Sequence, residues 1–189
     1  TNRIRKNGFV VITGPSGTGK SSLIQAGILP QLADAQLIVM RPGNNPLLSL
    51  YQHLKLIIPQ DKSALLEQSI SRGDVQEITK IIFRETNKKE GLTVIFVDQG
   101  EELITLCTEP EYRTTFGSIL SELGNRISSK IRVVYSLRED FFGPVGVLER
   151  LRNIFSRQVM VISTPTQSEL METLVGPANL FGYKFEDIA

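Results

Sequence analysis

The chain has 189 residues, which is enough for one well-buried domain and too few for two large ones. Its charge is nearly balanced, with 21 Lys and Arg against 20 Asp and Glu, and this argues against a dedicated nucleic-acid binder. One cysteine and one histidine exclude an intrachain disulfide and a Cys/His zinc site, so a reducing, cytoplasmic compartment is expected.

The two ends of the chain indicate a piece of a longer protein. The start, TNRIRKNGFVV, is typical of a last helical turn that leads into a strand, and the finish, FGYKFEDIA, has no terminating signal. The start is polar and basic rather than a signal sequence. No apolar run approaches the roughly 18 to 20 residues that span a bilayer, so we expect no membrane partner.

Short apolar runs alternate with longer stretches of helical periodicity, which predicts an α/β fold with a mainly parallel sheet. The expected strands are Phe9–Thr13, Leu37–Met40, Leu92–Val97, Ile131–Leu137 and Val159–Ile162. The expected helices are Ser21–Ile28, Pro46–Ile58, Lys62–Ser71, Asp74–Thr86 and Glu111–Ile127. Residues 42–91 form a long crossover that could hold an added helical layer. Thr164 or Thr166 is expected to cap a last helix.

Residues Gly14 to Ser21, here called the glycine loop, match the P-loop pattern GxxxxGK[ST] between a predicted strand and a predicted helix. We predict that this loop binds the phosphates of a nucleoside triphosphate through its amides and the N-terminus of the next helix. Lys20 would reach the β- and γ-phosphates, and the Ser21 hydroxyl would ligate magnesium. A turn that merely joins a strand to a helix is the alternative. The predicted binding residues are Gly14, Pro15, Ser16, Gly17, Thr18, Gly19, Lys20, Ser21 and Ser22.

Asp98 is the predicted second magnesium ligand. It follows the apolar run TVIFV, so its carboxylate should emerge at the carboxyl edge of the sheet, where the glycine loop also lies. An ordinary aspartate in a turn is the alternative.

The residues after Asp98 bear on hydrolysis. Many ATPases with an extra strand between the glycine-loop strand and this one have, at the position of Gln99, a glutamate that polarises the attacking water. The amide of Gln99 cannot accept a proton. Glu101 and Glu102 are the candidate catalytic acids, since either could turn toward the γ-phosphate if a helix begins there. A solvated first helical turn is the alternative. We therefore expect slow hydrolysis, or hydrolysis that depends on another subunit.

Arg138 ends the fourth predicted strand in SLRED and is the third catalytic candidate. In the expected topology the fourth strand lies between the first and the third. Arg138 would then point at the γ-phosphate and could distinguish triphosphate from diphosphate. A salt bridge to Glu139, Asp140 or a helix acid is the alternative. Arg41, in RPG after the second strand, is a weaker candidate of the same kind.

Five segments together resemble the novel-STAND class of signalling NTPases, relatives of the AAA+ ATPases: GPSGTGKSSLIQAGILPQL, RPGNNPLLSL, VIFVDQGEELITLC, VVYSLREDFFG and ELMETLVGPANLFGYKFED. The resemblance covers nearly the whole chain in the right order. It implies a three-layer α/β P-loop NTPase core over residues 1–165, with a five-stranded parallel sheet of order 5-1-4-3-2. It also implies that residues 166–189 begin a helical lid.

The resemblance also implies a function, that of an ATP-binding regulatory switch with slow ATPase activity. Its cofactors would be ATP or ADP and Mg²⁺, and its partners would be effector and sensor domains in the same longer chain. Triphosphate binding would permit a homo-oligomer to form. Antiviral defence in bacteria is one role that the class implies, and adenine preference rests on the resemblance alone.

Gly100 departs from the family pattern, which usually has an aromatic residue between the glutamine and the paired acids. We expect this glycine to remove a packing group and to loosen the backbone beside Asp98. Two other functions remain open, because the loop also resembles that of guanylate kinases and because AAA+ remodellers share the core. A nucleotide or small-molecule kinase would consume ATP rapidly with an acceptor, and a remodelling ATPase would turn over steadily.

Overall fold

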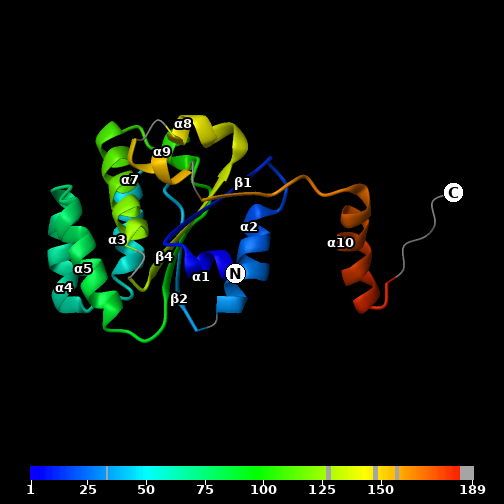
Figure 1. Ribbon diagram of the computed structural model, residues 1–189, viewed down its shortest axis with the longest axis horizontal. Coiled ribbons are helices and arrows are strands. Elements are labelled where there is room, and N and C mark those ends of the chain that lie inside the picture. Colours follow the sequence, from blue (N-terminus) through cyan, green and yellow to red (C-terminus); the bar gives the residue numbers. More distant parts are fainter. Residues whose placement is uncertain (33, 127–128, 147–148, 156–157, 184–189) are drawn as a thin grey trace.

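A computed structural model describes residues 1–32, 34–126, 129–146, 149–155 and 158–183 of the chain. Its centre is a five-stranded, all-parallel sheet in the order β2-β3-β4-β1-β5 (Figure 1). The strands are β1 (Phe9–Gly14), β2 (Gln36–Met40), β3 (Thr93–Val97), β4 (Ile131–Arg138) and β5 (Val159–Val161). The predicted α/β class and the predicted order 5-1-4-3-2 are therefore confirmed.

The three central strands are buried on both faces, because helices cover the sheet from either side. Every residue of β1 and β3 is buried, and β4 is buried up to Arg138. Continuous runs of Val, Ile and Phe suit such strands. The register sets Gly14 opposite Arg138 and Met40 opposite Val97, so the loops that follow these strands leave the sheet at one edge.

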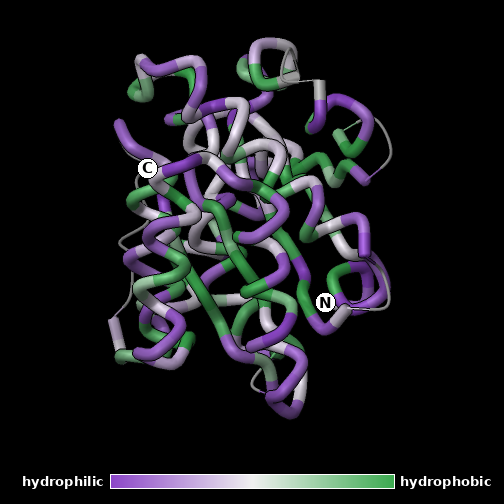
Figure 2. Tube along the Cα trace, turned by 90° about the vertical axis from the view of Figure 1, so that its left-hand side faces the viewer, coloured by the Kyte–Doolittle hydropathy of each residue, from purple (hydrophilic) through white to green (hydrophobic). Residues whose placement is uncertain are grey.

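The larger helical layer covers one face of the sheet, and three of its helices, α3 to α5, belong to the long crossover. It contains α3 (Pro46–Leu54), α4 (Gln60–Ser71), α5 (Val75–Asn87), α7 (Pro110–Asn125) and α9 (Glu149–Phe155). Helix α4 packs against α3 and α5, which makes it the added layer that the long crossover predicted. Figure 2 views this side of the molecule, where hydrophilic and hydrophobic residues alternate along the helices.

The smaller layer covers the other face with α1 (Asn2–Lys6) and the helix that follows the glycine loop. That helix is not regular over Ser21–Ile28 as predicted. It begins as α2 (Lys20–Ser22), widens to a π-helix over Leu23–Ile28 and tightens to a 3₁₀-helix over Leu29–Leu32. Pro30 contributes to this irregularity, since it has no amide hydrogen to continue the helical ladder.

Other predicted bounds shift by a few residues. Helix α3 ends at Leu54 rather than at Ile58, and α7 spans Pro110–Asn125, while the predicted end at Ile127 lies outside the described residues. Three short helices join the larger elements: α6 (Glu102–Thr105), the 3₁₀-helix Glu139–Phe141 and α8 (Phe142–Gly146). Among the described residues, none of the helices combines the length and apolarity needed to cross a membrane.

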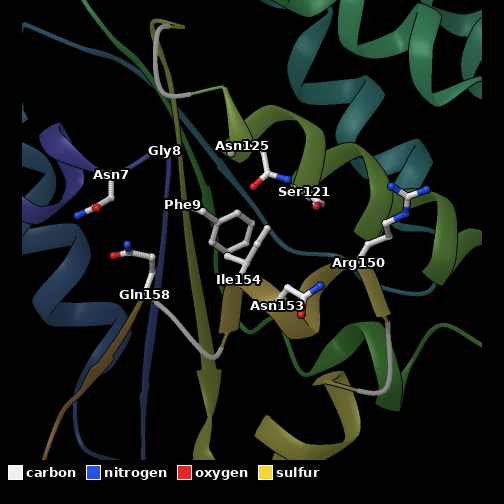
Figure 3. A pocket seen from close by; sticks show the side chains of 10 residues that line it. Asn7, Gly8, Phe9, Ser121, Asn125, Arg150, Asn153, Ile154 and Gln158 are labelled. Atoms are coloured by element: carbon white, nitrogen blue, oxygen red, sulfur yellow. Dashed lines mark hydrogen bonds between the residues drawn. The ribbon is translucent and has the colours of Figure 1, made fainter.

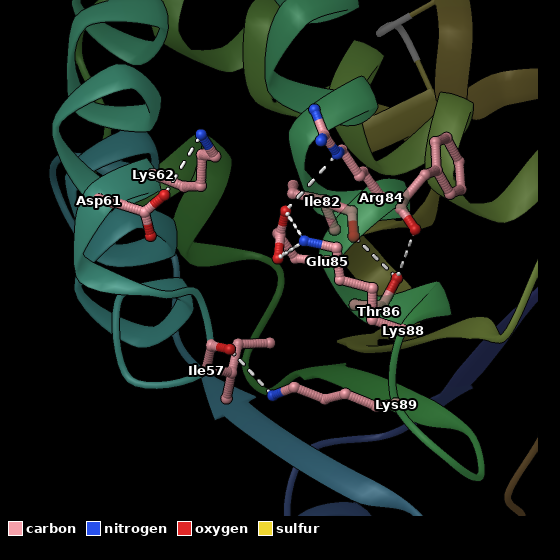
Figure 4. A network of polar contacts seen from close by, with 10 residues as sticks. Ile57, Asp61, Lys62, Ile82, Arg84, Glu85, Thr86, Lys88 and Lys89 are labelled. Carbon is pink, nitrogen blue, oxygen red and sulfur yellow. Dashed lines mark hydrogen bonds and ion pairs between the residues drawn. The ribbon is translucent and has the colours of Figure 1, made fainter.

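A polar network at the end of α5 ties the crossover to the sheet (Figure 4). The Glu85 side chain is 3% exposed, and Lys88 Nζ donates to its two carboxylate oxygens at 2.8 and 2.7 Å. Lys89 Nζ donates to the Ile57 carbonyl and to Gln36 Oε1, both at 2.9 Å. The two Lys89 contacts therefore connect the segment after α3 with the first residue of β2.

Helix α10 (Gln167–Leu180) stands apart from the sheet layers (Figure 1). Thr166 caps it in a reciprocal capping box with Glu169, and Thr166 is one of the two predicted caps. None of its residues is buried. The division into a core over residues 1–165 and a lid over 166–189 stays a prediction, and residues 184–189 lie outside the described part of the chain.

Candidate functional site

The predicted site residues gather at the carboxyl edge of the sheet, around a cavity of about 210 Å³. The glycine loop connects β1 to α2, Asp98 follows β3 and Arg138 ends β4. The residues that line the cavity are Ser16, Gly17, Gly19, Lys20, Ser21, Ser22, Gln99, Glu101, Ser136 and Arg138. Glycine-loop residues thus face side chains from the two strands that carry the other candidates.

The curled shape of the glycine loop depends on its glycines. Gly17 and Gly19 have φ angles of 80° and 75°, a region that favours glycine because it has no Cβ. At Gly14 the reason is a close approach, because a Cβ would lie 2.3 Å from the Ile162 carbonyl oxygen. The Thr18 hydroxyl donates to the Pro15 carbonyl at 2.9 Å and closes the curve from within.

Lys20 folds back over the glycine loop. Its Nζ donates to the carbonyl oxygens of Gly14 at 2.8 Å and Pro15 at 2.6 Å, and the residue is only 9% exposed. Burial lowers the pKa of Lys20, nearby Arg138 lowers it further, and Glu101 opposes the shift. An anion that enters the cavity would therefore meet two cations, one of them partly desolvated.

Ser21 and Asp98 come together, as the predicted magnesium pair requires. The Ser21 hydroxyl donates to Asp98 Oδ1 at 2.6 Å, and the Asp98 side chain is 1% exposed. The Asp98 amide donates to the Met40 carbonyl at 2.8 Å, which fixes the backbone at the strand end. A hydroxyl and a carboxylate are hard oxygen donors of the kind that Mg²⁺ prefers. The described residues contain no cluster of three or more His, Cys, Asp or Glu suited to a metal, so these two groups would share the ion with ligand oxygens or water.

Arg41 also contacts Asp98, a pairing that was not among the predicted contacts. Its Nη2 lies 3.3 Å from Asp98 Oδ2, on the side of the carboxylate away from Ser21. The signal was present in the predicted strand order, because β2 and β3 are neighbours and Met40 pairs with Val97. Arg41 and Asp98, which directly follow these two paired residues, are therefore brought close together.

The turn after Asp98 is held tightly, and the expectation that Gly100 loosens it is wrong. The Gly100 amide donates to the Ser136 carbonyl at 2.7 Å, and the Tyr135 hydroxyl donates to the Gly100 carbonyl at 2.8 Å. A Cβ on Gly100 would lie 2.1 Å from the Tyr135 ring. Burial raises the pKa of Tyr135 far above its ordinary value, so this donor stays protonated. Gln99 adopts a positive φ of 50° in the same turn.

The two candidate acids face different elements. Glu101 lines the cavity, and its Oε2 accepts the Arg138 amide at 3.3 Å. Glu102 is not among the residues that line the cavity, and its Oε2 accepts the Gly43 amide at 3.0 Å in the loop after β2. Only Glu101 therefore lies where it could act on a group bound in the cavity.

Arg138 lies at the cavity and forms the alternative salt bridge, while its predicted role at the γ-phosphate stays a prediction. It lines the cavity, and its guanidinium also pairs with Asp140 through contacts of 2.6 and 3.1 Å. The guanidinium lies 5.4 Å from the centre of the Phe141 ring. Because the side chain is 41% exposed, the ion pair is open to water and to competing anions.

Two further cavities differ in character from the one at the glycine loop. The first, about 500 Å³, lies at the amino end of β1 and is lined by Asn7, Gly8, Phe9, Ser121, Gly124, Asn125, Arg150, Asn153, Ile154 and Gln158 (Figure 3). It is larger, but four of its ten lining residues have side-chain amides and, of the ten, only Arg150 carries a charge. The second, about 670 Å³, lies between the glycine loop and α10, with Thr18 and Leu23 on one side and Glu169 and Thr173 on the other. Only the smallest of the three combines a glycine loop with charges of both signs.

Comparison with known proteins places the chain in a family. The sequence model of the family described as Novel STAND NTPase 1 matches residues 1–188, so the chain belongs to that family. No match was found among curated proteins. One solved chain similar in fold comes from the E. coli MS115-1 HORMA:CdnC:Trip13 complex, with 16% identity and a TM-score of 0.49. The alignment covers 95% of this chain and 56% of that one.

Proposed function

We propose that this member of the Novel STAND NTPase 1 family is an ATP-binding regulatory switch that holds Mg-ATP at the glycine loop. The observation that carries the proposal is the 2.6 Å contact between Ser21 and the buried Asp98, since Ser21 lines the same cavity as Lys20. A lysine, a hydroxyl and a carboxylate from two distant parts of the sequence support the proposal, because a metal-bound polyphosphate needs these three kinds of group.

The phosphates would lie in the 210 Å³ cavity. Lys20 would leave the carbonyl oxygens of Gly14 and Pro15 and pair with phosphate oxygens, since a phosphate is a stronger partner than a neutral carbonyl. Ser21 and Asp98 would hold Mg²⁺, whose positive charge neutralises phosphate oxygens. The base would lie in the wider hollow between Leu23 and α10.

Hydrolysis would be slow for a reason visible in the turn after Asp98. The residue directly after Asp98 is Gln99, whose amide cannot take a proton from water. Glu101 is the remaining acid at the cavity, but its carboxylate accepts the Arg138 amide. A second subunit, or a movement of this turn, would be needed to free a general base.

Control of an attached effector is the further part of the proposal. Arg138 would sense the γ-phosphate from β4, and α10 would begin a lid that closes over the nucleotide. The effector and sensor domains would belong to a longer chain, and triphosphate would favour a homo-oligomer. The residues around the cavity support the nucleotide step of this proposal, and family membership is the reason for proposing the later steps.

The experiment is isothermal titration calorimetry with Mg-ATP, Mg-ADP and Mg-GTP. We expect heat with the adenine nucleotides for the wild-type protein and none for Lys20→Ala, because the variant lacks the ammonium group under the phosphates. Lys80→Ala is the matched control, since Lys80 is an exposed lysine of α5. A folded wild-type protein that gives no heat with any nucleotide would remove the proposal. Rapid ATP consumption that needs a nucleoside monophosphate would indicate a kinase instead, and steady turnover of the isolated chain a remodelling ATPase.

A further inference from the structure

Asp98 is a buried carboxylate whose charge is already compensated. One oxygen accepts the Ser21 hydroxyl, and the other faces the Arg41 guanidinium. Of the ion pairs among the described residues, the one that involves Asp98 is with Arg41. A carboxylate that is 1% exposed is costly to leave without a counter-charge. Arg41 therefore supplies the positive charge beside Asp98 that a bound metal ion would otherwise supply.

The two contacts of Asp98 differ in how readily they can be broken. The Ser21 contact is short, at 2.6 Å, and belongs to the proposed metal pair. The Arg41 contact is longer, at 3.3 Å, and the Arg41 side chain is 56% exposed. An exposed guanidinium can move into water at little cost, so the Arg41 contact is the one that an incoming cation would replace.

The loop that carries Arg41, residues 41–45, is fixed by its neighbours at several points. The Ser49 hydroxyl donates to the Arg41 carbonyl at 2.6 Å, and Asn45 caps α3 by accepting the Leu48 amide at 2.9 Å. Gly43 turns the chain with a φ of 62°, and its amide donates to Glu102 Oε2 at 3.0 Å. Glu102 thus reaches from the turn after β3 to the loop after β2, the same two segments that the Arg41–Asp98 pair connects.

We infer that Arg41 is a resident counter-ion of Asp98 that Mg²⁺ displaces, and that Glu102 positions Arg41 by holding Gly43. The inference rests on the proposed function and deepens it, because it assigns different roles to the neighbouring acids Glu101 and Glu102. Glu101 faces the phosphate cavity. Glu102 is a positioning residue that acts through residues 41–45 and touches no bound group.

The consequence concerns the dependence of nucleotide binding on the metal. In the wild-type protein Mg²⁺ must break the Arg41–Asp98 pair, and the cost of doing so offsets part of the favourable free energy of metal binding. In Arg41→Gln the carboxylate lacks its cation until Mg²⁺ arrives. The ratio of ATP dissociation constants measured in EDTA and in Mg²⁺ should therefore rise, by about fivefold for a pair with one half-exposed partner.

The test measures this ratio by calorimetry for the wild-type protein, Arg41→Gln and the control Arg72→Gln, whose arginine is exposed at the end of α4. We expect the ratio to rise in Arg41→Gln alone. The melting temperature of Arg41→Gln without metal and nucleotide should also fall, and the added substitution Asp98→Asn should cancel most of that fall. An unchanged ratio overturns the inference, and so does a loss of affinity confined to Mg-ATP, which would make Arg41 a γ-phosphate contact.

Glu102 is tested by a pair of variants. Glu102→Ala loses the acceptor for the Gly43 amide and should shift the metal ratio in the direction of Arg41→Gln, whereas Glu102→Gln keeps an acceptor oxygen and should shift it little. If Gln is as damaging as Ala, the positioning role is wrong. A wild-type protein that binds no nucleotide overturns the proposed function and this inference together. Lys20-dependent binding with an unmoved metal ratio overturns the inference alone.

Discussion

At the scale of single residues, the candidate site depends on side chains that have partners within the protein before any ligand arrives. Lys20 donates to two carbonyl oxygens, Asp98 faces Arg41, and Arg138 faces Asp140. Each partner is weaker than a phosphate group or a metal ion would be. Ligand binding then exchanges contacts in a preformed site.

Arg138 gives a prediction at this scale. Arg138→Ala should reduce the preference for Mg-ATP over Mg-ADP while leaving Mg-ADP affinity nearly unchanged, because the guanidinium would contact the γ-phosphate alone. For a side chain that is 41% exposed we expect a loss of about 1 kcal/mol, or roughly fivefold. Paired calorimetric titrations with the two nucleotides measure it.

The control for Arg138 is its ion-pair partner. Asp140→Ala releases the guanidinium from its contacts with that carboxylate, so the triphosphate preference should persist or increase. Equal affinity of the wild-type protein for the two nucleotides would contradict the assigned role.

The residues of the glycine loop and Asp98 could be predicted from sequence, because a strand end fixes where the next side chain lies. The predicted strand order set the ends of β2 and β3 side by side, but the individual contacts of Asp98 and Glu102 could not be predicted. The Arg41–Asp98 pair depends on the register between β2 and β3, and the Glu102–Gly43 bond depends on the shape of two turns. A sequence pattern along one segment contains neither quantity.

At the scale of elements, the turn between β3 and α6 is clamped by β4. The Gly100 amide and carbonyl are both bonded to residues of β4, one through the Ser136 carbonyl and one through the Tyr135 hydroxyl. The sequence suggested looseness here because Gly100 replaces an aromatic residue of the family pattern. The Tyr135 ring from the neighbouring strand comes so close that a side chain at position 100 has no room.

Gly100→Ala should therefore destabilise the protein. The added methyl group would lie 2.1 Å from the Tyr135 ring, and relief of such overpacking typically costs about 1–3 kcal/mol. Urea unfolding followed by circular dichroism measures the change. Gly143→Ala is the matched control, since a Cβ at that position in α8 meets no atom within 4 Å and alanine favours a helix. Unfolding of the two variants at the same urea concentration would show that position 100 is not crowded.

The strands were predicted more accurately than the helix after the glycine loop. The α/β alternation came from apolar periodicity, while the order 5-1-4-3-2 came from resemblance to a family, because periodicity does not encode which strands are neighbours. Residues 21–28 have ordinary helical periodicity, whereas the segment from Leu23 to Leu32 is π-helical and then 3₁₀-helical where Ile24, Leu29 and Leu32 pack against the sheet. Local pattern cannot supply that packing.

At the scale of the whole molecule, the sheet core and α10 differ sharply in burial. The core buries two apolar clusters, one on each face of the sheet. Helix α10 buries none of its residues and leaves Leu170, Met171 and Leu174 about half exposed. A helix with so few packing contacts is stabilised mainly by its capping box and its own backbone bonds, so its local free energy of unfolding should be far below that of the core.

Limited proteolysis with thermolysin should therefore cut first within α10 and leave the sheet core intact. The cut is expected at the peptide bonds on the N-terminal side of the exposed Leu and Met residues of this helix.

If α10 begins a lid over the 670 Å³ hollow, Mg-ATP should slow this first cut several-fold, because the bound base would contact both Leu23 and the helix. Lys20→Ala should lose the protection while keeping the same cleavage pattern without nucleotide. Mass spectrometry of the fragments locates the cut. A first cut within β1, β3 or β4 would contradict the proposed boundary near residue 165, and a cut in α10 that Mg-ATP does not slow would separate that boundary from any role of the helix as a lid.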